Sequence, residues 1–99
     1  MTTISAVNPY NGKTLKTYEK DNSQTIATKL KNMMSIEKEW AVTSIGERTS
    51  LLAMVSKLLG ERKAKYARLI TEEMGKPISQ SIAEIEKCVW ACDFYVKNA

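Results

Sequence analysis

The sequence predicts an α+β fold that is mostly helical, with an N-terminal β-hairpin followed by about four helical segments. Apolar and polar residues alternate in two short stretches near the N-terminus, which is the period of β-strands. Apolar residues then recur at helical spacing from residue 23 onward. Ninety-nine residues are enough for one domain and no more. We therefore expect one domain over 1–99, divided into a hairpin at 4–18 and a helical region at 23–99.

The hairpin is expected from two alternating stretches, Ile4–Val7 and Leu15–Tyr18. The sequence between them, Asn-Pro-Tyr-Asn-Gly, is typical of a turn. Pro9 fixes φ near the value that a turn requires, and Gly12 or Asn11 can supply a positive φ.

The first helix is expected from about Ser23 to Ala41. Asp21, Asn22 and Ser23 are all residue types that cap helix N-termini. The β-branched pair Val42-Thr43 ends the helical pattern. The apolar residues at helical spacing are Ile26, Ala27, Leu30, Met33, Met34, Trp40 and Ala41.

Two more helical segments are expected before residue 75. Ser44 and Glu47 have the spacing of a capping box. Gly60 weakens the helix that follows and is expected to kink it. Gly75 can take the left-handed conformation that ends a helix, and Pro77 suits the first turn of the next. The apolar stripes are Leu51, Leu52, Val55, Leu58 and Leu59, and then Tyr66, Ala67, Leu69, Ile70 and Met74.

The last helix carries a heptad-like apolar seam over some twenty residues. Trp90 and Phe94 lie one turn apart but off that seam. We therefore expect this helix to have neighbours on more than one side. The seam consists of Ile78, Ile82, Ile85, Val89, Cys92 and Val96.

The composition excludes several classes of function. The net charge is +4, and its basic and acidic residues are interspersed, whereas a nucleic-acid binder more often segregates them. No apolar run is long enough to span a membrane, and the first residues show no signal peptide. Two cysteines in an otherwise ordinary chain favour a reducing, cytoplasmic setting. The chain has no histidine, which removes imidazole acid–base chemistry and histidine metal ligands.

Neither cysteine is assigned a chemical role. Cys88 and Cys92 are one helical turn apart, with Cβ atoms about 6 Å apart where a disulfide needs about 4 Å. A metal site would need two further soft donors. Acidic neighbours at Glu84, Glu86 and Asp93 disfavour a reactive thiolate. We expect Cys92 in the core and Cys88 half-buried.

The other chemically notable groups are expected to be structural. Carboxylates at 72, 73, 84 and 86 are interpreted as solvated, with Glu84 and Lys87 three residues apart on one helix face. A phosphate-binding role is conceivable for the basic residues, but acidic neighbours favour a surface role. Methionines could line an adaptable groove, although their helical spacing favours the core. The basic residues are Arg62, Lys63, Lys65 and Arg68, and the methionines are Met33, Met34, Met54 and Met74.

Four stretches in order resemble the N-terminal segment of an NAD(P)-dependent aldehyde dehydrogenase, and the succinate-semialdehyde branch is the most similar. The most specific stretch is Leu-Ile-Thr-Glu-Glu-Met-Gly-Lys-Pro. The matching stretches are Asn8-Pro9 with Gly12, Trp40, Glu47-Arg48 with Leu51-Leu52, and Leu69–Pro77.

The resemblance implies a single partial domain over 1–99, the peripheral part of a cofactor-binding domain. A complete relative oxidises an aldehyde, such as succinate semialdehyde, to the acid with NAD or NADP. The cysteine nucleophile, glutamate base, asparagine and phosphate loop of such enzymes would lie beyond residue 99. Some relatives bind a monovalent cation at positions that correspond to Val7 and Glu73, where Asp is usual at the second. We therefore assign no catalytic, cofactor-binding or metal residue, and we expect the chain alone to be inactive.

The competing interpretation is a stand-alone helical interaction module that docks another chain through its last helix. Both interpretations predict unpartnered apolar surface on this helix, and we expect self-association through it. The residues expected at that contact are Ile82, Ile85, Val89, Trp90, Cys92, Phe94 and Val96.

Overall fold

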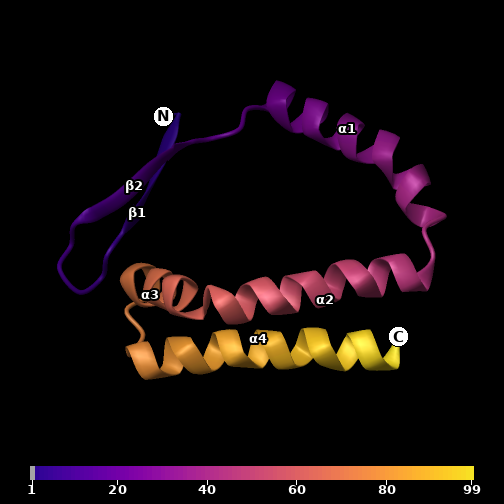
Figure 1. Ribbon diagram of the computed structural model, residues 1–99. Coiled ribbons are helices and arrows are strands. Elements are labelled where there is room, and N and C mark those ends of the chain that lie inside the picture. The colour runs from indigo at the N-terminus through magenta and orange to yellow at the C-terminus, as the bar shows by residue number, and fades with distance from the viewer. Residues whose placement is uncertain (1) are drawn as a thin grey trace.

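The computed structural model describes residues 2–99 and has two strands followed by four helices (Figure 1). This confirms the predicted α+β, mostly helical architecture. Within the described residues, no helix combines the length and the apolar character needed to cross a membrane. The elements are β1 (Thr3–Val7), β2 (Thr14–Glu19), α1 (Ser23–Ala41), α2 (Ile45–Glu61), α3 (Lys63–Met74) and α4 (Ile78–Asn98).

The two strands form an antiparallel hairpin whose register places Ile4 opposite Tyr18. The turn is closed by backbone hydrogen bonds, with the Gly12 N–H donating to the Asn8 carbonyl at 2.8 Å. Of the two candidates for a positive φ, Gly12 takes it, at +72°. The hairpin prediction is therefore confirmed, and each strand is slightly longer than its alternating pattern.

Helix α1 has the predicted bounds, and Asn22 is its N-cap. The Thr25 N–H donates to Asn22 Oδ1 at 2.8 Å, while the Asn22 N–H donates to Thr25 Oγ1 at 2.8 Å. This reciprocal pair is a capping box in which Thr replaces the usual Glu or Gln. The cap explains why the helix begins at Ser23.

The predicted capping box at the start of α2 is also confirmed. The Glu47 N–H donates to Ser44 Oγ at 3.1 Å, and the Ser44 N–H donates to Glu47 Oε2 at 3.2 Å. Gly60 stays helical, and the break between α2 and α3 falls at Arg62, where φ is −103° and ψ is 17°.

The break between α3 and α4 follows the chemistry of its glycine and proline. Gly75 has φ +73° and ends α3, as predicted. Pro77 differs from the prediction, because it lies immediately before α4 instead of in its first turn. Its extended ψ of 139° explains the difference, because the chain has not yet turned into the helix there.

Helix α4 runs antiparallel alongside α2 and also packs on α3 (Figure 1). Small residues let these helices approach, and Ser56, Ala67 and Ser81 are buried. Two hydroxyl contacts cross the interface, with Ser56 Oγ donating to Asp93 Oδ1 at 2.6 Å and the hydroxyls of Ser81 and Thr71 2.8 Å apart. Ile85, in the middle of the seam, is the large apolar side chain that is buried here.

Outside this helical packing the fold is open. The chain as a whole exposes 8215 Å² of surface, where a compact monomer of this size would expose about 5,700 Å². Its radius of gyration is 17.7 Å, against about 13 Å for a compact domain of this length. Every residue of α1 is exposed, and α1 arches away from α2 (Figure 1). Much of the predicted apolar stripe surface therefore has no partner among residues 2–99.

Candidate functional site

The two turns with the most distinctive sequences lie against each other. Pro9, in the hairpin turn, contacts the α3–α4 turn at Gly75, where a Cβ atom would lie 3.0 Å from Pro9 Cγ. Gly75 is therefore required twice, by its positive φ and by this close approach. We call this contact the hairpin–helix junction.

An ion pair secures the α3–α4 turn beside this junction. Lys76 Nζ donates to Glu84 Oε1 on α4. Glu84, which was expected on a solvated helix face with Lys87, is half-buried and paired, since the chain turns at Gly75 and brings Lys76 back over the first turns of α4. This ion pair joins the turn after α3 to α4.

The two residues that the resemblance implied as cation ligands belong to elements that meet at this junction. Val7 ends β1 and Glu73 lies in the last turn of α3. Among residues 2–99, no three side chains of the metal-binding types His, Cys, Asp and Glu lie close enough to hold a metal ion.

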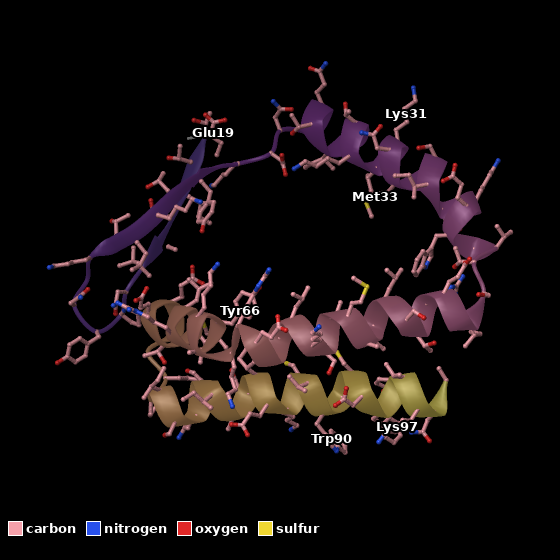
Figure 2. The ribbon with its side chains drawn as sticks, in the orientation of Figure 1. Glu19, Lys31, Met33, Tyr66, Trp90 and Lys97 are labelled. Atoms are coloured by element: carbon pink, nitrogen blue, oxygen red, sulfur yellow. The ribbon has the colours of Figure 1, made fainter. Side chains whose placement is uncertain are left out.

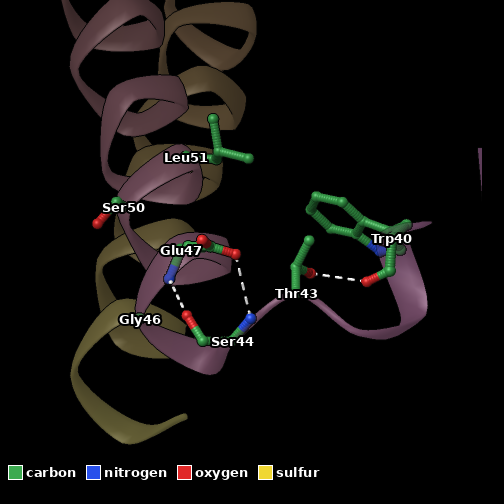
Figure 3. A pocket seen from close by; sticks show the side chains of 7 residues that line it. All are labelled: Trp40, Thr43, Ser44, Gly46, Glu47, Ser50 and Leu51. Carbon is green, nitrogen blue, oxygen red and sulfur yellow. Dashed lines mark hydrogen bonds between the residues drawn. The ribbon is translucent and has the colours of Figure 1, made fainter.

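A pocket of about 530 Å³ lies at the corner between α1 and α2 (Figure 3). Several of its polar groups hydrogen-bond to one another. Thr43 Oγ1 donates to the Trp40 carbonyl at 2.7 Å, and Glu47 and Ser44 bond each other in the capping box. Glu47 thus holds the start of α2 through one of its carboxylate oxygens. The lining residues are Trp40, Thr43, Ser44, Gly46, Glu47, Ser50 and Leu51.

A second hollow, of about 500 Å³, adjoins it along α1 and shares Trp40. We call this the α1 apolar surface. Figure 2 shows that Met33 points from α1 toward the side on which α2 lies. Its residues are Leu30, Met33, Met34, Ile36 and Trp40, with Glu37 at its edge.

The prediction that the methionines pack in the core is wrong. All four are exposed, and Met33 and Met34 lie on the α1 apolar surface. The helical spacing correctly placed them on apolar faces, but these faces have no neighbour within the described residues. Long, unbranched thioether side chains suit a surface that must adapt to a partner.

Both cysteines are more exposed than predicted, since Cys92 was expected in the core and Cys88 was expected to be half-buried. Cys92 is half-buried and Cys88 is exposed, and both thiols are free. They face no histidine, since the chain has none.

Three of the four residues of the basic patch have partners within the chain, as a surface role predicts. Arg68 Nε donates to Glu72 at 2.8 Å, and Lys63 lies 3.5 Å from a carboxylate oxygen of Glu86. Arg62 donates to the Tyr66 hydroxyl at 3.3 Å, and this hydrogen bond holds the pKa of Tyr66 below its ordinary value.

Comparison with known proteins gives one consistent result. Residues 1–99 match the aldehyde dehydrogenase family. The chain is 31% identical over 96 residues to a probable NADP(+) succinate-semialdehyde dehydrogenase of Synechocystis, covering 97% of this chain and 21% of that protein. It is 32% identical over 93 residues to the NAD(P)+ succinate semialdehyde dehydrogenase Sad of Escherichia coli, covering 94% and 20%. A relative from Deinococcus radiodurans is 30% identical over 92 residues.

The chain thus spans about a fifth of the length of these relatives. The sequence analysis identified the family but missed two contacts, Pro9 with Gly75 and Arg48 with Trp40. The contact of Arg48 with Trp40 had a signal in the sequence, namely an aromatic residue at the end of one helix and an arginine in the first turn of the next.

Proposed function

The chain belongs to the aldehyde dehydrogenase family of oxidoreductases, and from this we propose that it is the N-terminal segment of an enzyme that oxidises an aldehyde to the acid. The single observation that carries the proposal is the family match over the whole chain together with coverage of about a fifth of each relative. In the complete enzyme, NAD or NADP accepts the hydride. The similarity of the chain to three succinate-semialdehyde dehydrogenases supports succinate semialdehyde as the substrate.

Within such an enzyme, this segment is a scaffold. It contributes no nucleophile, base or cofactor-binding residue, and its role is to cover other parts of the enzyme with the α1 apolar surface. The support is physical: 8215 Å² of exposed surface exceeds the value for a compact monomer by about 2,500 Å². An excess of this size is comparable to one side of a large obligate interface.

A chimera tests this proposal. The matching segment of the Synechocystis enzyme is replaced by this chain, and the reduced nicotinamide formed with succinate semialdehyde is measured. We expect activity above that of the enzyme lacking the segment. The matched control carries the E. coli segment, which belongs to a relative of similar identity to this chain. If that control is active and the chimera with this chain is not, the proposal is contradicted.

The isolated chain provides the complementary measurement. With succinate semialdehyde and either cofactor, we expect no reduced nicotinamide above background. Activity that Cys88→Ala or Cys92→Ala abolishes would show that this segment has chemistry of its own.

We also propose a cytoplasmic setting and self-association of the isolated chain through α4. The free thiols support the first. The second is supported by Trp90 and Phe94, which are exposed and lie 6.0 Å apart between ring centroids, with Tyr95 beside them. Ile85 is already buried inside the chain, so these aromatic residues are the better candidates for the contact. An interaction module would use the same surface, and the chimera distinguishes the two functions.

A further inference from the structure

The direction of α1 is not set by packing against a core. All of its residues are exposed, and among the described elements it has no extensive contact with any other helix or strand. It leaves α2 at a sharp angle (Figure 1). Something at the α1–α2 corner, residues 40–48, must therefore hold that angle.

Two local devices at this corner do not span it. The Thr43 N–H and hydroxyl both donate to the Trp40 carbonyl, at 3.1 and 2.7 Å, so they extend the end of α1 as far as Thr43. The capping box joins Ser44 to Glu47 and fixes only the start of α2. The chain is free to pivot between residues 43 and 44 as far as these bonds are concerned.

Arg48 spans the pivot. From the first turn of α2, its Nη2 donates to the Trp40 carbonyl at 2.6 Å and its Nε donates to Thr43 Oγ1 at 2.8 Å. Its guanidinium carbon also lies 5.1 Å from the centroid of the Trp40 ring. Among the described residues, the hydrogen bonds that join 40–43 to 44–48 both come from this one side chain.

The chemistry suits an arginine. The last carbonyls of a helix lack intrahelical partners and carry partial negative charge, so a cation there is stabilising. A planar guanidinium can donate in two directions and stack on an indole at the same time. A lysine ammonium keeps the charge but cannot reproduce this fork. Arg48 is also half-buried, which strengthens its hydrogen bonds.

We propose that Arg48 is the positioning residue that sets the angle between α1 and α2, by holding the C-terminal end of α1 from the first turn of α2. The α1 apolar surface and the corner pocket share Trp40. The contact of Arg48 with Trp40 therefore also sets the orientation of these two hollows relative to each other. The inference rests on the corner geometry alone and does not depend on the proposed enzyme function.

The test uses the full chain with Trp90→Phe, so that Trp40 is the remaining tryptophan. Arg48→Lys is compared with Arg68→Lys, a matched control whose guanidinium pairs with Glu72 within α3. The readouts are the Trp40 emission maximum, its quenching by acrylamide and the X-ray scattering radius of gyration, at a concentration where light scattering gives a monomer.

We expect Arg48→Lys to shift Trp40 emission to the red, increase quenching and move the radius of gyration away from 17.7 Å, with far-UV circular dichroism unchanged. Arg68→Lys should do none of this. If the two variants are indistinguishable, the proposal is overturned.

A second pair keeps the test decisive if Arg48→Lys unfolds. Thr43→Val removes the acceptor of Arg48 Nε, while Thr43→Ser keeps it. A red shift and more quenching in the valine variant, but not in the serine variant, supports the proposal. Equal signals in both variants overturn it.

Discussion

Gly75→Ala at the hairpin–helix junction should destabilise the chain through two separable effects. The first is backbone strain, because Gly75 has φ +73° and the left-handed region costs a residue with a Cβ about 1–2 kcal/mol. The second is steric, because the new Cβ would lie 3.0 Å from Pro9 Cγ. Pro9 is exposed and can yield a little, so we place this term at the lower end for overpacking, about 1 kcal/mol. The expected total is about 2–3 kcal/mol.

Gly12→Ala is the matched control. Gly12 has nearly the same φ, +72°, but a Cβ atom added there would have no neighbour within 4 Å. It should show the strain alone, about 1–2 kcal/mol. The difference between the two variants measures the contact of the hairpin with the α3–α4 turn.

Pro9→Ala completes a double-mutant cycle, because it removes the Cγ atom that the new Cβ would meet. In the Gly75→Ala background, it should recover about 1 kcal/mol relative to its effect alone. The free energy of unfolding is measured by urea titration followed by circular dichroism, in a fixed concentration of an osmolyte that favours the folded state. Equal losses in the two glycine variants, or no coupling with Pro9, would refute the argument that the turns are in contact.

Three further predictions concern individual contacts. Trp90→Glu should shift the chain from a dimer or higher oligomer toward monomer in light scattering, because Trp90 is an exposed apolar side chain on α4; a monomeric parent at high micromolar concentration would contradict this. Ser56→Ala should cost about 1 kcal/mol in urea unfolding, because it removes the 2.6 Å hydrogen bond to Asp93 between α2 and α4; an unchanged midpoint would count against that bond. Arg62→Gln should raise the pKa of Tyr66 back toward 10.0 in an ultraviolet titration, because the lowering comes first from the Arg62 hydrogen bond; no movement would exclude that cause.

The limits of the helices and the turns could be predicted because their causes are local. A cap such as Ser44 with Glu47 involves groups three residues apart, and Gly12 and Gly75 adopt the conformations that glycine alone adopts easily. Where the prediction was slightly wrong, at Gly60, the reason is also local. A helix tolerates one glycine, and the break came at Arg62, which has no side-chain cap.

Contacts between distant parts of the chain could not be predicted in this way. Nothing in the sequence around Pro9 indicates that Gly75 lies beside it. The contact between them depends on the position of the whole hairpin relative to α3. The ion pair of Glu84 was missed for the same reason. Glu84 was interpreted as part of a solvated helix face, but the turn at Gly75 brings Lys76 into reach.

The exposed methionines show that helical spacing of apolar residues does not by itself imply burial within the chain. Apolar residues at helical spacing show which face of a helix needs to be covered, but they do not show what covers it. On α4, the seam residue Ile85 is buried within the chain, although it was expected at the contact with a second copy. On α1, Met33 and Met34 follow an equally good pattern and remain exposed, so their face needs a surface that residues 2–99 do not supply. An apolar stripe without a partner is therefore itself evidence about the missing surface. On α1 that surface must be apolar, must tolerate flexible thioether side chains, and must meet a helix whose direction Arg48 has already set.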